Sequence, residues 1–265
     1  MGDLGRVAET FRIINIDADP DTSNFSPAQI EQLKGRGRNR VISYLNFGAC
    51  ENYRSYWTKA PAGFVAAGEN HTAHVGAYDG YPNETWMDLG NADYQHLMVD
   101  YVAPRLVAQG VDGFFLDNME LVEHSPNEHN GACSATCRQG GLDMVRRLRE
   151  KYPQMLIVMQ NATSDITRTG RTGGIPFVSL LDGISHEEVY TPQPNADFER
   201  ELLNWKSLAL KPGGRDFWIA TEDYVGNASN TSGARSVYDK SRANGFSPYA
   251  SDESAKQQHV FYWPF

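Results

Sequence analysis

Eight short apolar runs, spaced roughly 20 to 40 residues apart, recur along this chain of 265 residues. Patterns typical of helices lie between several of them and cover Ser26–Lys34, Asp93–Gln109, Leu142–Tyr152 and Phe198–Leu210, with Pro104 expected to kink the last turn of the second. This alternation predicts parallel strands covered by helices. The length suits one (β/α)8 TIM barrel of the α/β class spanning residues 1–265, because no linker divides the chain. The eight predicted strands are Phe11–Ile16, Val41–Leu45, His74–Tyr78, Gly113–Leu116, Leu156–Met159, Val178–Leu181, Asp216–Ala220 and Phe246–Tyr249.

The fourth run places an acid and an amide, Asp117 and Asn118, directly after a wholly apolar strand. Residues 113–116 are too few for a helix, and a continuous apolar run is typical of a parallel strand buried on both faces. In a parallel barrel the catalytic residues lie at this end of the strands. Asp117 is therefore a candidate catalytic carboxylate. The competing interpretation is that it caps the turn or helix that follows.

Polar and aromatic side chains also follow most of the other predicted strands. Chance surface polarity would not track strand ends in this way, and sugar hydroxyls need many hydrogen-bonding partners. The pattern predicts a carbohydrate site at the rim of the barrel. Its members include Asp17, Asn46, Glu51, Asp117, Asn118, Gln160, Asn161, Glu187, Glu188, Tyr190, Glu222 and Tyr224.

Cleavage of a glycosidic bond generally needs two carboxyl groups. The best partner for Asp117 is one of the adjacent pair Glu187 and Glu188, of which only one can face the barrel interior. The alternate series from Ser179 to Glu187 is smaller and more polar than its neighbours, which favours Glu187. We expect Asp117 to act as nucleophile or base and Glu187 as general acid, with its pKa raised by burial or a negative neighbour.

Charge and composition exclude several functions. The formal net charge is −9 and no lysine or arginine cluster is present, which argues against a nucleic-acid partner and favours a neutral or cationic one. No apolar run approaches the roughly 20 residues that would span a bilayer. The N-terminus lacks the apolar core of a signal peptide. We nevertheless expect a secreted protein, from which any export signal has been removed.

We expect no cofactor and no metal ion. The segment Gly170–Gly174 lacks the spacing of a phosphate-binding loop, and the aspartates after residue 16 lack the Gly and Glu of a calcium loop. Three cysteines are too few for a disulfide framework, although Cys133 and Cys137 are spaced so that a bridge across a loop is possible. We expect a monomer.

Several motifs in combination resemble those of glycoside hydrolase family 114, the endo-α-1,4-polygalactosaminidase-like barrels. They are Val41–Leu45, Glu51–Arg54, Trp86–Leu89, Gly110–Asn118, Gln160–Asn161 and Glu187–Tyr190, and the resemblance covers nearly the whole chain. It implies a TIM barrel that hydrolyses α-1,4-linked galactosamine polymers. It places the two family acids on Asp117 and Glu187, and supporting positions on Trp86, Asp88, Asn118, Asn161 and Tyr224.

Substrate contacts are expected from ten residues: Asp17, Tyr44, Asn46, Trp86, Asp88, Asn118, Asn161, Glu188, Tyr190 and Tyr224. Trp86 and Asp88 have a competing interpretation as a packed anchor and a helix cap, and Tyr44 and Asn46 as core and turn residues. Many family members have an acid where this chain has Ala49, which affects the expected substrate contacts.

Two other functions fit the same residues. Family 31 α-glucosidases resemble the fourth strand and would also use Asp117 as nucleophile. A carbohydrate-binding barrel without activity would keep the aromatic residues but would not need both acids. The preferred hypothesis is hydrolysis of a cationic amino-sugar polymer or oligosaccharide.

Overall fold

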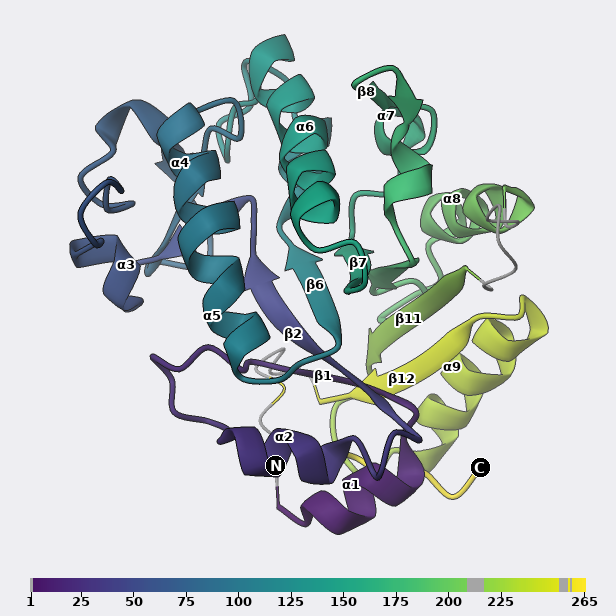
Figure 1. Cartoon of the computed structure of the whole chain (residues 1–265). Helices are drawn as coiled ribbons and strands as arrows, with labels where there is room; N and C mark the ends of the chain where they lie inside the picture. The colour runs from purple at the N-terminus through teal and green to yellow at the C-terminus, as the bar shows by residue number, and fades with distance from the viewer. Residues whose placement is uncertain (1, 209–216, 253–256, 258) are drawn as a thin grey trace.

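The computed structural model describes residues 2–208, 217–252, 257 and 259–265, and within them seven parallel strands form one curled sheet (Figure 1). Their order is β1, β2, β6, β7, β10, β11, β12, so β1 and β12 are its edges. The rings of Phe11, just before β1, and Tyr249, in β12, meet edge-on with centroids 5.9 Å apart. The sheet therefore closes on itself through side chains, and the predicted barrel-like α/β fold is confirmed. The strands are β1 Ile13–Ile16, β2 Arg40–Asn46, β6 Gly113–Asp117, β7 Leu156–Gln160, β10 Gly183–Glu187, β11 Trp218–Tyr224 and β12 Ser247–Ser251.

Helices surround the sheet (Figure 1). The longest of them is α6. Helix α2 begins with a capping box, in which the side chains of Ser26 and Gln29 each accept the other residue's backbone N–H. Proline at the first helical position also favours a helix start here. No helix within the described ranges is long and apolar enough to cross a membrane. The helices are α1 Leu4–Thr10, α2 Pro27–Leu33, α3 Ser55–Thr58, α4 Ala92–His96, α5 Ala103–Ala108, α6 Ala135–Lys151, α7 Asp165–Arg168, α8 Ala196–Ser207 and α9 Thr231–Ala243, with short 3-10 turns η1 His71–Ala73, η3 Met119–Glu123 and η4 Phe177–Leu180.

Pro104 lies at the junction of two kinds of helix. The expected helix is built from α4, a π-helical segment η2 at Leu97–Val102, and α5, in whose first turn Pro104 lies. The N–H of Ala103 reaches back to the carbonyl of Met98. Because proline has no N–H and crowds the preceding turn, the helix widens into a π-helical turn before Pro104.

Two of the predicted barrel strands are wrong. His74–Tyr78 is largely β4, His74–Ala77, which belongs to a separate sheet, and Val178–Leu181 is mostly the 3-10 turn η4, followed by the true strand β10. Both runs are apolar because they pack against the core, and periodicity alone does not separate such segments from strands. Residue 216 of the seventh predicted strand and residues 209–210 of the last predicted helix lie outside the described residues.

A small antiparallel sheet stands beside the barrel between β2 and β6. It consists of β3 Ala49–Glu51, β5 Glu84–Met87 and β4, in the order β3, β5, β4. The glycine between β2 and β3 makes this junction possible, since a Cβ on Gly48 would lie 1.8 Å from the carbonyl oxygen of Asn118. The side sheet is thereby held against the end of β6.

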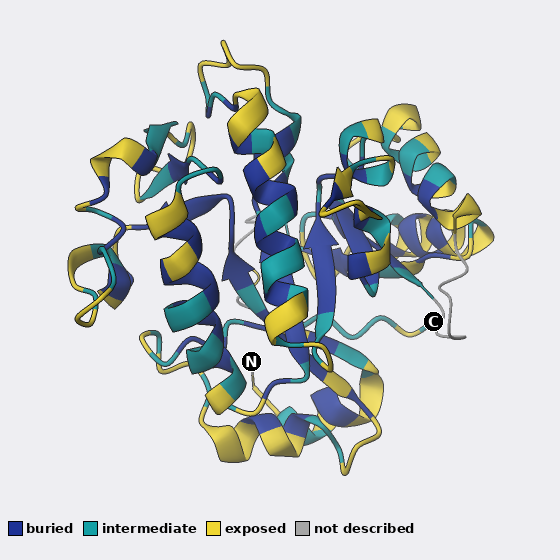
Figure 2. Ribbon diagram, turned by 45° about the horizontal axis from the view of Figure 1, so that its top comes forward, coloured by how far each residue is buried: buried dark blue, intermediate teal, exposed yellow. Residues whose placement is uncertain are grey.

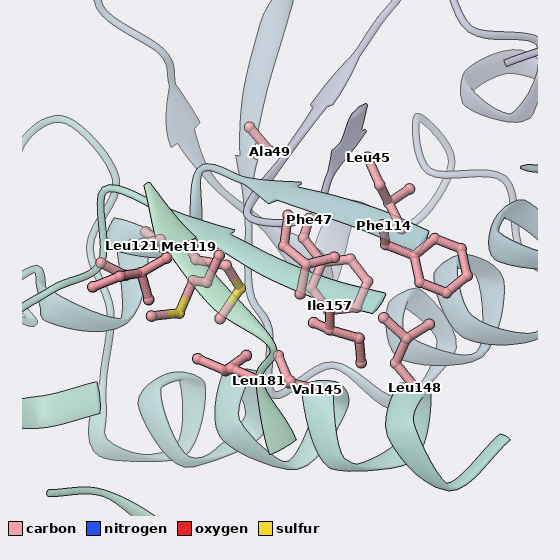
Figure 3. Close-up of a cluster of buried hydrophobic side chains, with 14 of the residues drawn as sticks. Leu45, Phe47, Ala49, Phe114, Met119, Leu121, Val145, Leu148, Ile157 and Leu181 are labelled. Carbon is pink, nitrogen blue, oxygen red and sulfur yellow. The ribbon is translucent and has the colours of Figure 1, made fainter. Parts of the chain in front are cut away.

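The described residues form two apolar cores. The larger lies between the sheet and the helices, and Figure 3 shows Phe114 of β6 and Ile157 of β7 meeting Val145 and Leu148 of α6. The smaller fills the barrel interior with Ile42, Phe115 and Val158. Figure 2 shows the strands dark blue between helices that carry exposed residues on their outer faces.

The bridge that the spacing of Cys133 and Cys137 allowed is present. The disulfide spans the start of α6, with the two Cα atoms 5.3 Å apart. It fixes the end of the long segment that follows β6. Cys50 is a free, buried thiol.

Candidate active site

Strand alternation brings polar side chains to the inside of the barrel at its carboxyl end. Asp117 is the register partner of Asn46 on β2, and Glu187 is the partner of Glu222 on β11. Both Asp117 and Glu187 line one open cavity of about 970 Å³. Other residues that line it include Asp17, Tyr44, Glu51, Tyr53, Arg54, Tyr78, Tyr81, Glu84, Phe115, Asn118, Gln160 and Asn161.

Asp117 sits in an environment that balances its two protonation states. Burial is the main influence and favours the protonated form, as does the negative charge of Glu187. Hydrogen bonds from the backbone N–H of Asn118 and from the Tyr44 hydroxyl favour the carboxylate. The net effect raises the pKa of Asp117 to about 7. Asp117 can therefore exchange a proton near neutral pH.

Glu187 is held from two neighbouring strands. Asn161, directly after β7, donates its Nδ2 to Glu187 Oε2 at 2.9 Å, and its Oδ1 accepts the Glu187 backbone N–H at 3.0 Å. The Tyr224 hydroxyl, at the end of β11, donates to Glu187 Oε1. Asn161 has a φ of 60°, a conformation that asparagine tolerates better than most residues. Glu187 thus has a fixed carboxyl group facing the cavity.

The side sheet adds a second pair of carboxyl groups, those of Glu51 and Glu84, to the cavity. Glu84 Oε2 accepts from Asn46 Nδ2 at 2.9 Å and from Asn118 Nδ2 at 3.4 Å. Asn118 also donates to Asn46 Oδ1 at 2.8 Å. Burial, followed by the charge of Glu51, raises the pKa of Glu84 to about 7. The amides of Asn46 and Asn118 thus connect Glu84 of the side sheet to the ends of β2 and β6.

The buried guanidinium of Arg54 lies between Glu51 of this pair and the aspartates that follow β1. Arg54 contacts Glu51 Oε1 at 3.0 Å, Asp17 Oδ2 at 3.2 Å and Asp19 Oδ2 at 3.7 Å. Because the Arg54 side chain is only 3% exposed, these carboxylates are its main counter-charges. Asp17, predicted to contact substrate, lines the cavity next to this cation.

Aromatic rings form one wall of the cavity. Tyr78 stacks on Trp86 with centroids 4.1 Å apart, and Tyr81 lies 4.7 Å from Tyr78. The Trp86 indole N–H donates to Asn130 Oδ1 at 2.7 Å. Trp86 is 1% exposed, so it supports Tyr78 from behind as a packed anchor, while Tyr78 and Tyr81 line the cavity.

Three other predicted contacts lie away from the cavity lining. Asp88 closes a turn by accepting the N–H of Gly90 at 2.8 Å. Glu188 is exposed, with a φ of 54° that turns the chain out of β10. Tyr190 is buried, and its hydroxyl donates to Glu199. By contrast Tyr44, Asn118 and Asn161 line the cavity, Asn46 holds Glu84 beside it, and Tyr224 reaches Glu187.

Sequence reasoning misses three titratable groups near the site, Glu84, Tyr81 and Glu120. Glu84 and Tyr81 follow His74–Tyr78, which the sequence wrongly predicts as a barrel strand, and no sequence pattern marks either residue. Glu222, which the sequence does predict at the rim, is buried, and burial, then the charge of Glu187, raises its pKa to about 8. Burial and then Asp117 raise the pKa of Glu120. Glu84 could be placed beside the site only from the tertiary structure.

Comparison with known proteins relates the chain to one family. The family model of glycoside-hydrolase family GH114 matches residues 3–179. An uncharacterized protein of Deinococcus radiodurans is 26% identical over 257 residues, which cover 92% of this chain and 74% of that protein.

Two solved structures share the fold. The glycoside hydrolase domain of PelA from Pseudomonas aeruginosa superimposes with a TM-score of 0.70 at 16% identity, covering 98% of this chain and 94% of that one. Ega3 of Aspergillus fumigatus, crystallised in complex with galactosamine, gives 0.62 at 19% identity, covering 91% and 84%. At these identities the likeness shows the fold.

Proposed function

This chain belongs to glycoside-hydrolase family GH114, and from that premise we propose that it cleaves α-1,4-linked galactosamine polymers with Asp117 and Glu187 as its catalytic carboxyl groups. Asp117 attacks the anomeric carbon or activates a water molecule there, and Glu187 protonates the departing glycosidic oxygen. The observation that carries this proposal is that both carboxyl groups line the same open cavity.

The surroundings of the two acids support these roles. Tyr44 and the Asn118 N–H stabilise the ionised form of Asp117 that attack requires. Glu187 is oriented by Asn161 and Tyr224. The strands β6 and β10 are separated only by β7, which places their backbones roughly 10 Å apart, two strand spacings. Side chains that extend inward from both strands can therefore reach one sugar unit from two sides.

The proposed substrate class follows from charge, from aromatic rings and from the galactosamine bound to the related fold of Ega3. Five carboxylates, Asp17, Glu51, Glu84, Asp117 and Glu187, line the cavity together with Arg54. Tyr53 and Tyr81, 60% and 49% exposed, offer ring faces to a sugar. An acidic, aromatic cavity that is open to solvent suits an internal stretch of a cationic polysaccharide.

We also propose that the protein acts outside the cell. The Cys133–Cys137 disulfide supports this location, because such bonds persist mainly in oxidising compartments.

The direct test is mass spectrometry of the products formed from partly deacetylated polygalactosamine. We expect a series of short galactosamine oligomers, as an enzyme that cuts within a chain produces. Parallel digests with α-linked glucans test the alternative of a family 31-type α-glycosidase. If no oligosaccharide appears from polygalactosamine while a glucan is cleaved, the proposed substrate is wrong.

A further inference from the structure

We infer that Glu51 and Glu84 form the subsite that recognises the protonated 2-amino group of the sugar attacked at Asp117. The inference rests on the proposed function and assigns to named residues the choice between an amine and an acetamide. It starts from the pairing of β3 with β5, in which Glu51 and Glu84 are direct register partners.

The two glutamates form the closer kind of antiparallel pair. The next pair along, Asn52 and Asn83, is joined by a hydrogen bond from the Asn52 N–H to the Asn83 carbonyl at 2.8 Å. Hydrogen-bonded and non-bonded pairs alternate, so Glu51 and Glu84 occupy a non-bonded position, where Cα atoms approach to about 4.5 Å. Like charges directly opposite each other are destabilising, and a cation between them would remove that cost.

The cations in the described part of the chain do not satisfy this pair. Arg54 binds one oxygen of Glu51 but is shared with Asp17 and Asp19. Glu84 accepts from the two neutral amides of Asn46 and Asn118. Three cavity-lining carboxylates, those of Asp17, Glu51 and Glu84, thus face one guanidinium on this wall.

A second observation points to a missing ligand. The Glu51 side chain is 1% exposed although it lines the cavity, and its Oε2 is buried with no hydrogen-bond partner among the described residues. A buried carboxylate oxygen normally has a donor, because leaving it unsatisfied carries the full cost of desolvation. An ammonium group offers three donors and a positive charge to this wall.

The position of the pair explains why it would act on the reacting sugar. Asn118 follows Asp117 directly and donates to Glu84, so the pair lies next to the attacking carboxylate. The 2-amino group is bonded to the carbon next to the anomeric carbon. The anomeric carbon becomes positively charged in the transition state. A neighbouring ammonium opposes that charge, and two carboxylates around the ammonium offset the opposition. An N-acetyl group would bring no charge to the pair and would add bulk.

The test compares Glu84→Gln with the parent on free-amine and fully N-acetylated galactosamine oligomers. The introduced amide oxygen can still accept from Asn46 and Asn118, so the substitution removes the charge while keeping the shape. We expect kcat/KM for the free-amine oligomer to fall about tenfold or more, as loss of a charge-assisted contact does, while the acetylated oligomer changes less than about threefold. Glu84→Asp, which keeps the charge, should retain part of the preference. Asp79→Asn is the matched control, because it removes an exposed charge from the loop between β4 and β5, outside the cavity lining.

A binding measurement separates this inference from the proposed reaction. Calorimetric titration with galactosamine and with galactose needs no turnover. The parent should bind galactosamine more tightly than galactose, and Glu84→Gln should abolish that preference while Asp79→Asn keeps it. An unchanged amine preference in Glu84→Gln, in rate or in binding, would overturn the inference even if the polymer is cleaved. If the parent cleaves no galactosamine polymer but Glu84→Gln removes the binding preference, the subsite stands and the proposed reaction fails.

Discussion

Asn161 holds Glu187 at two points: its Nδ2 donates to the carboxylate at 2.9 Å, and its Oδ1 accepts the backbone N–H of the same residue at 3.0 Å. A single amide at the end of β7 therefore sets both the backbone and the side chain of an acid on β10. This makes Asn161 a positioning residue for the candidate general acid.

Asn161→Asp tests this role. The change keeps the size of the side chain and one acceptor, but replaces the donor to Glu187 with a negative oxygen. We expect kcat to fall about 10- to 100-fold with KM nearly unchanged, because orientation of the acid matters in the transition state. Initial rates over a range of substrate concentrations provide the measurement. A rise in KM with unchanged kcat would show that Asn161 serves binding instead.

Replacement of the two catalytic candidates should abolish turnover and leave binding intact. Asp117→Asn and Glu187→Gln keep volume and remove charge, so we expect losses of roughly a thousandfold or more in kcat. Calorimetry with galactosamine oligomers reports binding. For Asp117→Gly, added azide should restore bond cleavage and yield a glycosyl azide, because a small anion can occupy the place of the lost carboxylate. Azide rescue of Glu187→Gly with a glycosyl azide of inverted configuration, and no such rescue of Asp117→Gly, would reverse the two roles.

The pH dependence should reflect Asp117. Burial and Glu187 raise the pKa of Asp117 to about 7 in the free protein, and Asp117 must be ionised to attack. The quantity kcat/KM should therefore rise as pH increases through about 7. Glu84 is one of the charges that raise this pKa, so the rise should begin at lower pH in Glu84→Gln. Profiles of kcat/KM between pH 4 and 9 decide this, and coincident profiles would exclude the electrostatic link.

Glu222 should make the fold less stable at alkaline pH. Its pKa is raised to about 8 in the folded protein, mainly by burial, against about 4.3 for an unperturbed glutamate. Folding therefore favours its protonated form, and the stability from this difference is lost as pH rises through about 8. Glu222→Gln cannot ionise, so its Tm should exceed that of the parent by several degrees at pH 9 and approach it near pH 5. Thermal unfolding followed by circular dichroism checks both values.

Salt should weaken the reaction on the cationic polymer. The formal charge is −9 and the cavity is acidic, so attraction over distance contributes to binding. The Debye length falls from about 10 Å at 0.1 M to about 3 Å at 1 M ionic strength. We expect kcat/KM on deacetylated polymer to fall across this range, and the rate on acetylated polymer to change little. Equal rates at low and high salt on the deacetylated polymer would contradict the proposed charge of the substrate.

Residue patterns along the chain were enough to predict the barrel-like fold and most of the polar rim. Parallel strands must be apolar on both faces, so their ends and the polar residues after them are visible as composition along the chain. Alternation along β10 favours Glu187 as the inward residue, and in the structure Glu187 lines the cavity while Glu188 is exposed at the turn that ends the strand. These features depend on neighbours in sequence.

The second carboxyl pair and the aromatic wall depend on contacts between segments that are far apart in the sequence. Glu51 and Glu84 meet because β3 pairs with β5 across 33 residues, and β4 joins that small sheet although its sequence is as apolar as a barrel strand. Trp86 supports Tyr78 because Asn130, 44 residues away, accepts its indole N–H. Burial raises the pKa values of Asp117, Glu84 and Glu222, and the negative charge of Glu187 or of Glu51 adds to the effect. Strand pairing and burial are set by contacts between distant segments, and residue patterns along the chain do not predict those contacts.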